Sequence, residues 1–247
     1  MKLSVLVLTK DEEENLPRLL ESLKLLPVEY EVVVVDSGST DGTPEIARRY
    51  GAKFVVREWR GYVEQRRYAL TLARGEWVLF MDADEWITPA LAGEIAGALD
   101  GGYDGYVIPR RNVYLGKLQR MKPTALLRLA RKGKVRIRGR YVHEYLEVEG
   151  RVGRLKGYIG HRPYRSLLHH WSKNTHYATL SAREKLEAGR GVSWADLLLR
   201  FPLMFLRYYI LQWAFLDGKR GLIYSLSQAW YHFQKYALLY EARRGHP

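Results

Sequence analysis

The chain has 247 residues, of which 47% are hydrophobic, so it can bury a core as one domain with an extension or as two small domains. It contains no cysteine, which excludes disulfide bonds and thiolate metal sites and leaves oxygen and imidazole ligands for any bound metal. The formal net charge is +13, and the short N-terminal apolar run leads directly into acids, unlike a signal peptide, so we expect a cytoplasmic protein.

The first hundred residues alternate between apolar strands and helices. Strands are predicted at 2–9, 31–36, 53–58 and 76–82, with helices at 15–23, 44–50, 62–74 and from 89 onward. Thr43 and Thr88 are expected N-caps, each followed by a proline, and Gly51 is expected to end the second helix. This alternation predicts an α/β fold with an open, mostly parallel sheet flanked by helices.

The pattern changes at about residue 104. Segments 104–116, 134–150 and 153–164 are typical of short, basic strands with glycine turns, and the chain from 166 onward is predicted to be helical. We therefore expect a domain at 1–165, with halves at 1–103 and 104–165, and a basic, aromatic-rich helical extension at 166–247. The apolar stretch 197–216 is interrupted by Arg200, Pro202 and Arg207, which makes it a poor spanning helix. It suits a helix in a membrane interface or one that caps the core.

Charge is divided unevenly along the chain. Residues 1–100 carry 12 Lys and Arg against 18 Asp and Glu, a net charge of −6, whereas the remaining residues carry a net charge of +19. This bias indicates an anionic partner for the second part, such as a nucleic acid, a phosphorylated glycan or an anionic membrane face.

Polar residues end three of the predicted strands: Thr9, Asp36 and Asp82. Open α/β sheets bind ligands beyond the carboxyl ends of their strands, so these residues predict a site. Asp82 and Asp84, separated by one residue, can converge on Mg²⁺ or Mn²⁺, which prefer oxygen ligands and substrate phosphates. The alternative is that Asp84 or Glu85 caps the following turn. Asp36 can accept a hydrogen bond from a base or ribose, or it can organise an Asx-type turn.

Three motifs carry a family resemblance. The segments "SVLVLTKDEEENL", "VVVVDSGSTDGT" and "GEWVLFMDADE", in this order, resemble the family 2 glycosyltransferases of the GT-A fold over residues 1–100. The later segments "RLARKG", "VHEYLEV", "GYIGH" and "RYYILQWAFLDGKRGL" resemble the subgroup that includes lipopolysaccharide core β-1,4-glucosyltransferases. Asp11 stands where the family usually has Asn.

The resemblance implies an inverting enzyme that uses Mg²⁺ or Mn²⁺ and moves a hexose from a nucleotide sugar, with a UDP-hexose as the first expectation. The acceptor would be a lipid-linked or lipopolysaccharide-core type saccharide at the inner face of the cytoplasmic membrane, where the enzyme would be peripheral. Residues 1–103 would then form the nucleotide-sugar half of a GT-A domain, and residues 104–165 the acceptor half.

The resemblance also implies roles for single residues. Glu144 would be the general base. The nucleotide sugar would be bound by Thr9, Glu12, Asp36, Arg66 (or Arg67, if the register is off by one) and Asp82. The metal would be held by Asp82, Asp84 and His161. Beside the resemblance, Glu85 would contact the acceptor or serve the turn, and Arg128 would contact the acceptor or a phosphate, or be a solvated charge.

Two other functions compete with this one. A sugar-phosphate nucleotidyltransferase normally has a glycine-rich, basic loop after its first strand, whereas this chain has the acidic "TKDEEEN" there. A basic nucleic-acid-binding protein is disfavoured because acids at the strand ends would repel phosphates, and no standard binding motif is visible.

Overall fold

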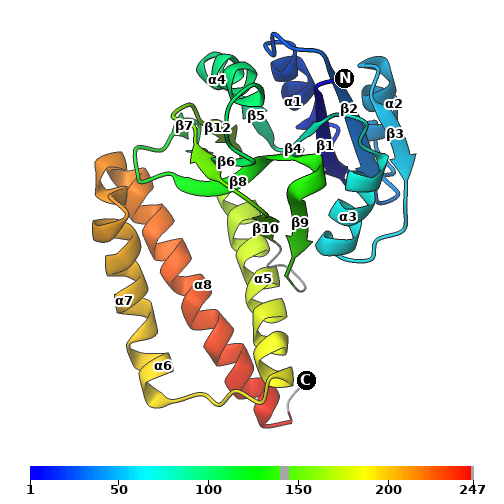
Figure 1. Ribbon diagram of the computed structural model, residues 1–247. Coiled ribbons are helices and arrows are strands. Elements are labelled where there is room, and N and C mark those ends of the chain that lie inside the picture. Colours follow the sequence, from blue (N-terminus) through cyan, green and yellow to red (C-terminus); the bar gives the residue numbers. More distant parts are fainter. Residues whose placement is uncertain (140–144, 246–247) are drawn as a thin grey trace. The chain divides into compact units, whose positions relative to one another are not determined.

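The computed structural model describes residues 1–139 and 145–245. It contains two compact units (Figure 1). We call residues 1–111 with 123–161 the sheet unit, and residues 112–122 with 162–247 the helical unit. The predicted boundary after residue 165 lies close to the division at 161, but the sequence gives no sign that 112–122 belongs with the helices.

Parallel strands with intervening helices form the first part of the sheet unit. The strands are β1 (Leu3–Thr9), β2 (Tyr30–Asp36), β3 (Lys53–Val56) and β4 (Trp77–Asp82), in the order β3-β2-β1-β4. The helices are α1 (Leu16–Leu23), α2 (Thr43–Arg49), α3 (Tyr62–Leu72) and α4 (Pro89–Leu99). The predicted open, mostly parallel sheet is thereby confirmed.

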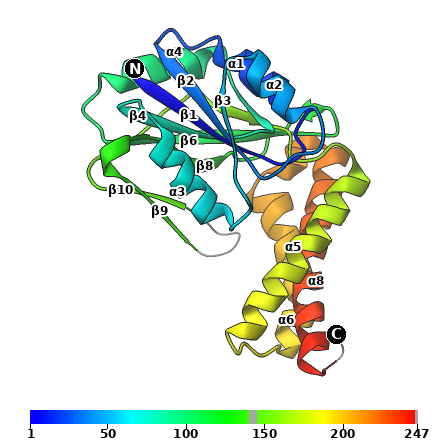
Figure 2. The same ribbon diagram turned by 90° about the vertical axis from the view of Figure 1, so that its right-hand side faces the viewer.

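The strands are apolar throughout because both faces of the sheet are covered. On one face, Val5 and Val7 pack in a core with residues of α1, α2 and α4. On the other face, Leu6 and Val33 pack with Ala69 of α3 (Figure 2). Each fully buried Leu or Val contributes roughly 1.5–3 kcal/mol, so this two-sided burial fixes the register of β1 in the sheet.

The predicted helix ends are mostly confirmed. Gly51 follows α2 with a φ of +73°, and the Thr88 side chain accepts a hydrogen bond from the Leu91 backbone N–H at 3.4 Å. Thr43 was expected as the N-cap of α2, but this prediction is wrong, because the helix begins at Thr43 and Gly42 occupies the cap position. The Thr43 hydroxyl is instead used in the loop network described below.

The second part of the sheet unit adds strands that pair antiparallel, with one exception. These are β5 (Glu85–Ile87), β6 (Gly105–Tyr114), β8 (Thr124–Arg131), β9 (Val135–Arg138), β10 (Tyr145–Val148), β11 (Val152–Arg154) and β12 (Ile159–His161). The exception is β11, which runs parallel to β6. Beyond β4 the sheet continues in the order β8-β6-β12-β5, while β9 and β10 form a separate ribbon. Strand β8 was not predicted, and it runs antiparallel to β4, with Trp77–Leu79 of β4 paired to Leu129–Arg131.

The helical unit is built around one long helix, α8 (Lys219–Arg243), which packs against α5 (Leu167–Glu187) and α7 (Arg200–Leu206) (Figure 1). Shorter elements connect them: α6 (Trp194–Leu198), the π-helical η2 (Arg207–Leu211) and the 3-10 helix η3 (Ala214–Asp217). The two-residue strand β7 (Lys117–Leu118) pairs with the end of β6. Within residues 1–139 and 145–245, every helix is too short or too polar to cross a membrane.

Candidate active site

The carboxyl ends of β1, β2 and β4 meet at one edge of the sheet. Thr9 is in register with Asp36, and Leu8 is in register with Asp82. The three polar strand ends that the sequence singled out therefore lie side by side, at the edge where open α/β sheets bind ligands.

Asp36 is fully engaged by its own loop. Its Oδ1 accepts hydrogen bonds from the backbone N–H groups of Gly38 (2.9 Å) and Ser39 (2.7 Å). Its Oδ2 accepts from the hydroxyls of Thr9 (2.7 Å) and Ser39 (2.5 Å), and the residue is 1% exposed. These contacts match the second role considered for Asp36, the organisation of an Asx-type turn. In this arrangement Asp36 and Thr9 shape the loop that follows β2 and present no open acceptor to a nucleotide.

The loop after β1 is tied to the loop after β2. Asp11 has a φ of +54°, a conformation that Asn and Asp tolerate better than most residues, which explains why Asp can stand where the family usually has Asn. Its Oδ1 accepts the Thr40 N–H at 2.8 Å. The Glu12 backbone N–H donates to the Thr43 hydroxyl at 2.8 Å, and the Glu12 carboxylate accepts from the Asn15 amide at 2.8 Å. Glu12 is thus placed beside the strand-end edge and helps to fix both loops.

An arginine and carboxylate cluster lies at the end of β4. Asp82 Oδ1 is 2.7 Å from Arg66 Nη2, and Asp82 Oδ2 is 2.7 Å from Arg128 Nη2. The same Arg128 nitrogen is 2.9 Å from Glu85 Oε1, which is also 3.2 Å from Arg110 Nη1. Three guanidinium groups therefore surround two carboxylates, and their surplus positive charge can bind an anion.

The two carboxyl groups of this cluster differ in their electrostatics. Desolvation by the surrounding protein raises the pKa of both. For Asp82 the nearby guanidinium groups of Arg128 and Arg66 outweigh this effect and hold its pKa well below the ordinary value. For Glu85, which is fully buried, desolvation prevails, the Asp82 charge adds to it, and the pKa is raised. Asp82 is therefore ionised at neutral pH, while ionised Glu85 depends on its arginine partners.

Arg66 and its neighbour Arg67 point in different directions. The Arg66 side chain is 6% exposed and reaches Asp82, whereas the Arg67 side chain is 51% exposed and pairs with Glu64 at 2.8 Å. Of the two arginines that the sequence offered for the nucleotide, Arg66 is the one at the strand-end edge.

Asp84 and His161 form a pair suited to a divalent cation. The antiparallel pairing of β12 with β5 brings His161 Nε2 to 3.2 Å from Asp84 Oδ2. The His161 side chain is 11% exposed and the Asp84 side chain 16%. The Asp82 side chain is 33% exposed, but both of its oxygens are paired with arginines. In the described part of the chain, no three His, Asp or Glu side chains gather closely enough to hold a metal by themselves. The pair fits a shell of two protein ligands completed by substrate phosphates and water.

The sequence model of the family described as "Glycosyl transferase family 2" matches residues 4–159, more than half of the chain. The chain belongs to glycosyltransferase family 2. It is accordingly an enzyme, and the family membership sets aside the nucleotidyltransferase and nucleic-acid-binding alternatives.

Several relatives of this family 2 glycosyltransferase are similar over most of its length. The lipopolysaccharide core biosynthesis glycosyltransferase LpsC of Rhizobium meliloti is 32% identical over 260 residues, which cover 98% of this chain and 93% of LpsC. An uncharacterized glycosyltransferase of Rickettsia typhi is 28% identical over 97% of this chain and 87% of its own length. The crystal structure of residues 1–349 of S. aureus TarS with UDP-GlcNAc has a TM-score of 0.51 at 20% identity, covering 99% of this chain and 92% of that TarS fragment. This last likeness supports the GT-A type fold with its C-terminal helices.

The remaining predicted site residues of the glycosyltransferase have mixed positions. Glu144 lies outside the described residues. Glu85 is fully buried, and its Oε2 accepts the Asp82 backbone N–H at 2.9 Å, which matches the turn-forming alternative and leaves no surface for an acceptor. The Arg128 side chain, 8% exposed, faces the carboxylates instead of an open surface.

Sequence reasoning missed two residues of this edge. Arg110 lies in a basic strand where no local signal ranks it above its neighbours. Gln65 is fully buried, and its Nε2 donates to the Ser37 hydroxyl and the Arg57 carbonyl, both at 3.2 Å. A polar side chain on the inner face of α3, next to Arg66, was the only available hint.

Proposed function

We propose that this glycosyltransferase moves a hexose from a UDP-linked sugar to a lipid-linked saccharide of the lipopolysaccharide-core type, with inversion at the anomeric carbon. The observation that carries the proposal is the strand-end edge, where a metal-binding pair lies beside a positively charged arginine cluster. The similarity to LpsC, a lipopolysaccharide core biosynthesis enzyme, supports the acceptor class. TarS, crystallised with UDP-GlcNAc, supports the UDP-linked donor.

Asp84 and His161 are the residues that would hold Mg²⁺ or Mn²⁺, since their ligand atoms lie 3.2 Å apart and neither side chain is fully buried. A bound divalent cation neutralises charge on the departing diphosphate. Asp82 stays ionised and orients Arg66 and Arg128; it joins the metal shell only if a bound diphosphate draws those arginines away.

Arg66, Arg110 and Arg128 supply the fixed positive charge for the diphosphate. Guanidinium groups bind phosphate oxygens through paired N–H donors, and their carboxylate partners hold them in place before the donor arrives. Because the cluster has one more guanidinium than carboxylate, a diphosphate is attracted to it even with Asp82 and Glu85 ionised. Thr9, Glu12 and Asp36 maintain the adjoining loops against which the nucleotide would lie.

Inversion requires a base on the acceptor side, opposite the leaving group. We assign this role to Glu144, on the resemblance to the family. Glu144 takes the proton of the acceptor hydroxyl. The hydroxyl oxygen bonds to the anomeric carbon, while the bond from that carbon to the diphosphate oxygen breaks. The nucleoside diphosphate leaves with the electron pair of the broken bond. The reaction is therefore a single displacement that inverts the anomeric carbon.

The acceptor places the enzyme at the inner face of the cytoplasmic membrane as a peripheral protein. A net charge of +19 on residues 101–247 favours an anionic glycolipid and an anionic leaflet.

A thermal-shift screen of nucleotide sugars with Mg²⁺ or Mn²⁺ tests the donor assignment. A ligand at about 100 times its Kd stabilises the folded state by about 2.7 kcal/mol, which for a chain of this size raises the midpoint by roughly 5–10 °C. We expect this shift with a UDP-hexose and metal, and a much smaller shift for Asp84→Asn. Absence of a shift with every nucleotide sugar would refute the proposal.

A further inference from the structure

The helical unit exposes an unusual amount of large apolar surface between α6 and η3. The side chains concerned are 44–79% exposed: Trp194, Leu198, Leu199, Leu203, Leu206, Ile210, Leu211, Trp213, Phe215 and Leu216. We call these residues the α6–η3 surface. A concentration of exposed large apolar side chains in one segment of a folded protein points to a binding surface.

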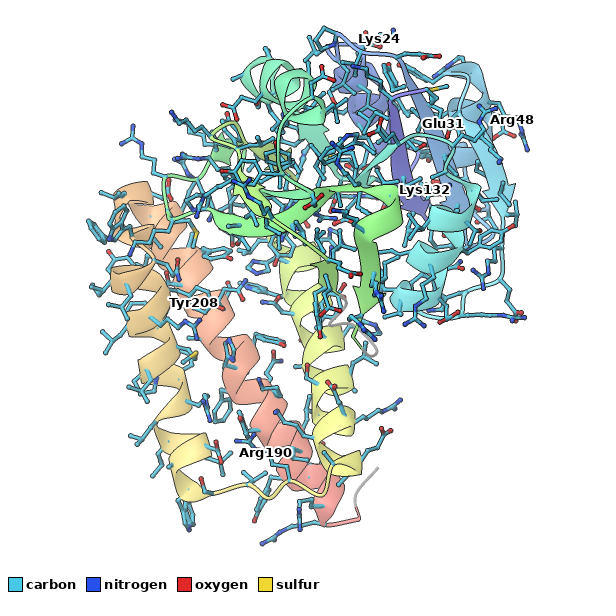
Figure 3. All side chains as sticks on the ribbon, viewed as in Figure 1. Lys24, Glu31, Arg48, Lys132, Arg190 and Tyr208 are labelled. Atoms are coloured by element: carbon cyan, nitrogen blue, oxygen red, sulfur yellow. The ribbon has the colours of Figure 1, made fainter. Side chains whose placement is uncertain are left out.

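The α6–η3 surface is ordered by packing on its inner side. Leu199, Leu203, Leu206 and Ile210 recur at intervals of four, three and four residues, which places them along one stripe of α7 and η2. Other residues of the same segment face α8: Arg200 Nη2 lies 3.2 Å from the Tyr236 hydroxyl. Tyr208, labelled in Figure 3, lies 3.4 Å from His232 Nε2. These contacts with α8 fix the inner face of the segment, so the apolar stripe on its other face stays exposed.

The charge around this surface is predominantly basic. Residues 194–222 include two acids, Asp196 and Asp217. Asp196 is 14% exposed and pairs with Arg200 at 2.7 Å. Asp217 is 8% exposed and accepts the Arg120 backbone N–H at 3.1 and 3.0 Å. Arg207, Lys219 and Arg220 are basic residues of the same segment. A second copy of the chain would bring these like charges together, whereas an anionic lipid surface complements both the apolar and the basic groups.

The backbone of this segment suits a surface that lies in the membrane plane. Pro202, the π-helical turn of η2 and Trp213, with a φ of +64°, break it into short pieces. Such pieces cannot cross a bilayer, but an amphipathic helical segment can rest at the headgroup boundary with its apolar side chains inserted. Exposed Trp194 and Trp213 suit that boundary, where tryptophan is enriched.

We propose that the α6–η3 surface inserts into the interface of an anionic membrane and holds the enzyme there as a monotopic protein. The proposal rests on the proposed function, because a lipid-linked acceptor is what gives the enzyme a substrate in that plane. It adds the identity of the membrane-binding residues.

Vesicle co-sedimentation of the full chain tests the proposal. We expect binding to vesicles of equal parts phosphatidylglycerol and phosphatidylcholine, weaker binding to phosphatidylcholine alone, and a loss of binding as salt is raised. Leu206→Glu should weaken partitioning by at least about ten-fold, because an inserted leucine is replaced by an acid. Leu25→Glu is the matched control, since Leu25 is 45% exposed in the sheet unit and Leu206 is 51% exposed.

A second comparison isolates charge. The triple variant Arg207→Gln, Lys219→Gln, Arg220→Gln should lose about five-fold per basic residue, on the order of 100-fold in total. Its control removes the same charge from the sheet unit by Lys2→Gln, Lys24→Gln and Arg48→Gln; the last two are labelled in Figure 3. Because the controls have the same net charge, a general effect of charge would weaken both equally.

Three results would overturn the proposal. They are absence of vesicle binding by the unmodified chain, equal losses of vesicle binding in test and control variants, and a dimer in gel filtration that becomes a monomer in Leu206→Glu. The UDP-hexose thermal shift separates this failure from failure of the proposed function. A chain that keeps its donor-dependent shift but does not bind vesicles leaves the glycosyltransferase assignment intact.

Discussion

Arg128→Met tests whether the arginine cluster is the electrostatic centre of the site. The Arg128 side chain is 8% exposed and lies 2.7 Å from Asp82 and 2.9 Å from Glu85. Its loss leaves the fully buried Glu85 with Arg110, at 3.2 Å, as its remaining arginine partner, beside the hydrogen bond from the Asp82 backbone N–H. Breaking a buried ion pair by removing one partner costs about 3–5 kcal/mol in the free energy of unfolding. We expect a loss of stability near the lower bound, because Arg110 remains beside Glu85.

The pH dependence of this loss carries a definite sign. The folded-state pKa of Glu85 is raised above its ordinary value of 4.5, and it rises further in the variant. The folded state then binds a proton more tightly than the unfolded state, so stability falls as the pH rises from 4.5 through the folded-state pKa. Lowering the pH from about 7.5 to about 5.5 should therefore restore part of the loss in Arg128→Met, and change the unmodified chain less.

Urea denaturation at the two pH values is the assay, with Arg131→Met as the control on the same strand. The Arg131 side chain is 30% exposed and pairs with Glu76, which is 62% exposed, so its removal should cost less than about 1 kcal/mol. Equal losses for the two variants, or a loss in Arg128→Met that does not shrink at the lower pH, would show that Glu85 does not depend on Arg128.

Three further predictions concern single residues. Asp84→Asn should lower metal-dependent turnover by at least about 100-fold, while Asp100→Asn, on the exposed side of the sheet unit, should not. Glu144→Gln should lower turnover by about 10²–10⁴-fold and leave donor affinity, measured by calorimetry, unchanged; a collapse of affinity would contradict its role as base. Burial lowers the pKa of His170 from 6.5 to about 4. Between these pH values the unfolded state therefore binds more protons than the folded state. The free energy of unfolding is at its full value above pH 6.5 and falls as the pH is lowered from there towards 4. In denaturation series at falling pH, His170→Gln should lose less of this stability, by up to about 3 kcal/mol, whereas His176→Gln should behave like the unmodified chain.

The gathering of Thr9, Asp36 and Asp82 could be predicted because it depends on local patterns. Each residue ends an apolar run, and parallel strands bring such ends to one edge. The closeness of Asp84 and His161 could not be predicted from local patterns, since it depends on the pairing of β5 with β12. The sequence suggested His161 only through the family resemblance.

The arginine cluster and the state of Asp36 could not be predicted, because they depend on contacts between distant segments. Strand β8 carries Arg128 to Asp82, 46 residues earlier in the chain, and its own pattern did not reveal which strand it would join. Asp36 is satisfied partly by the Thr9 hydroxyl, 27 residues away, so its preference for the loop over a ligand was not visible locally. Local periodicity predicts elements, whereas these partners are set by tertiary packing.

The central claim is tested most directly by following sugar transfer itself. The purified chain is incubated with a UDP-hexose, Mn²⁺ and a truncated lipopolysaccharide-core acceptor, and the products are analysed by NMR. We predict metal-dependent release of UDP in an amount equal to the sugar transferred, and a β-linked product from an α-linked donor. Retention of the α configuration, or release of UMP or pyrophosphate in place of UDP, would contradict the account.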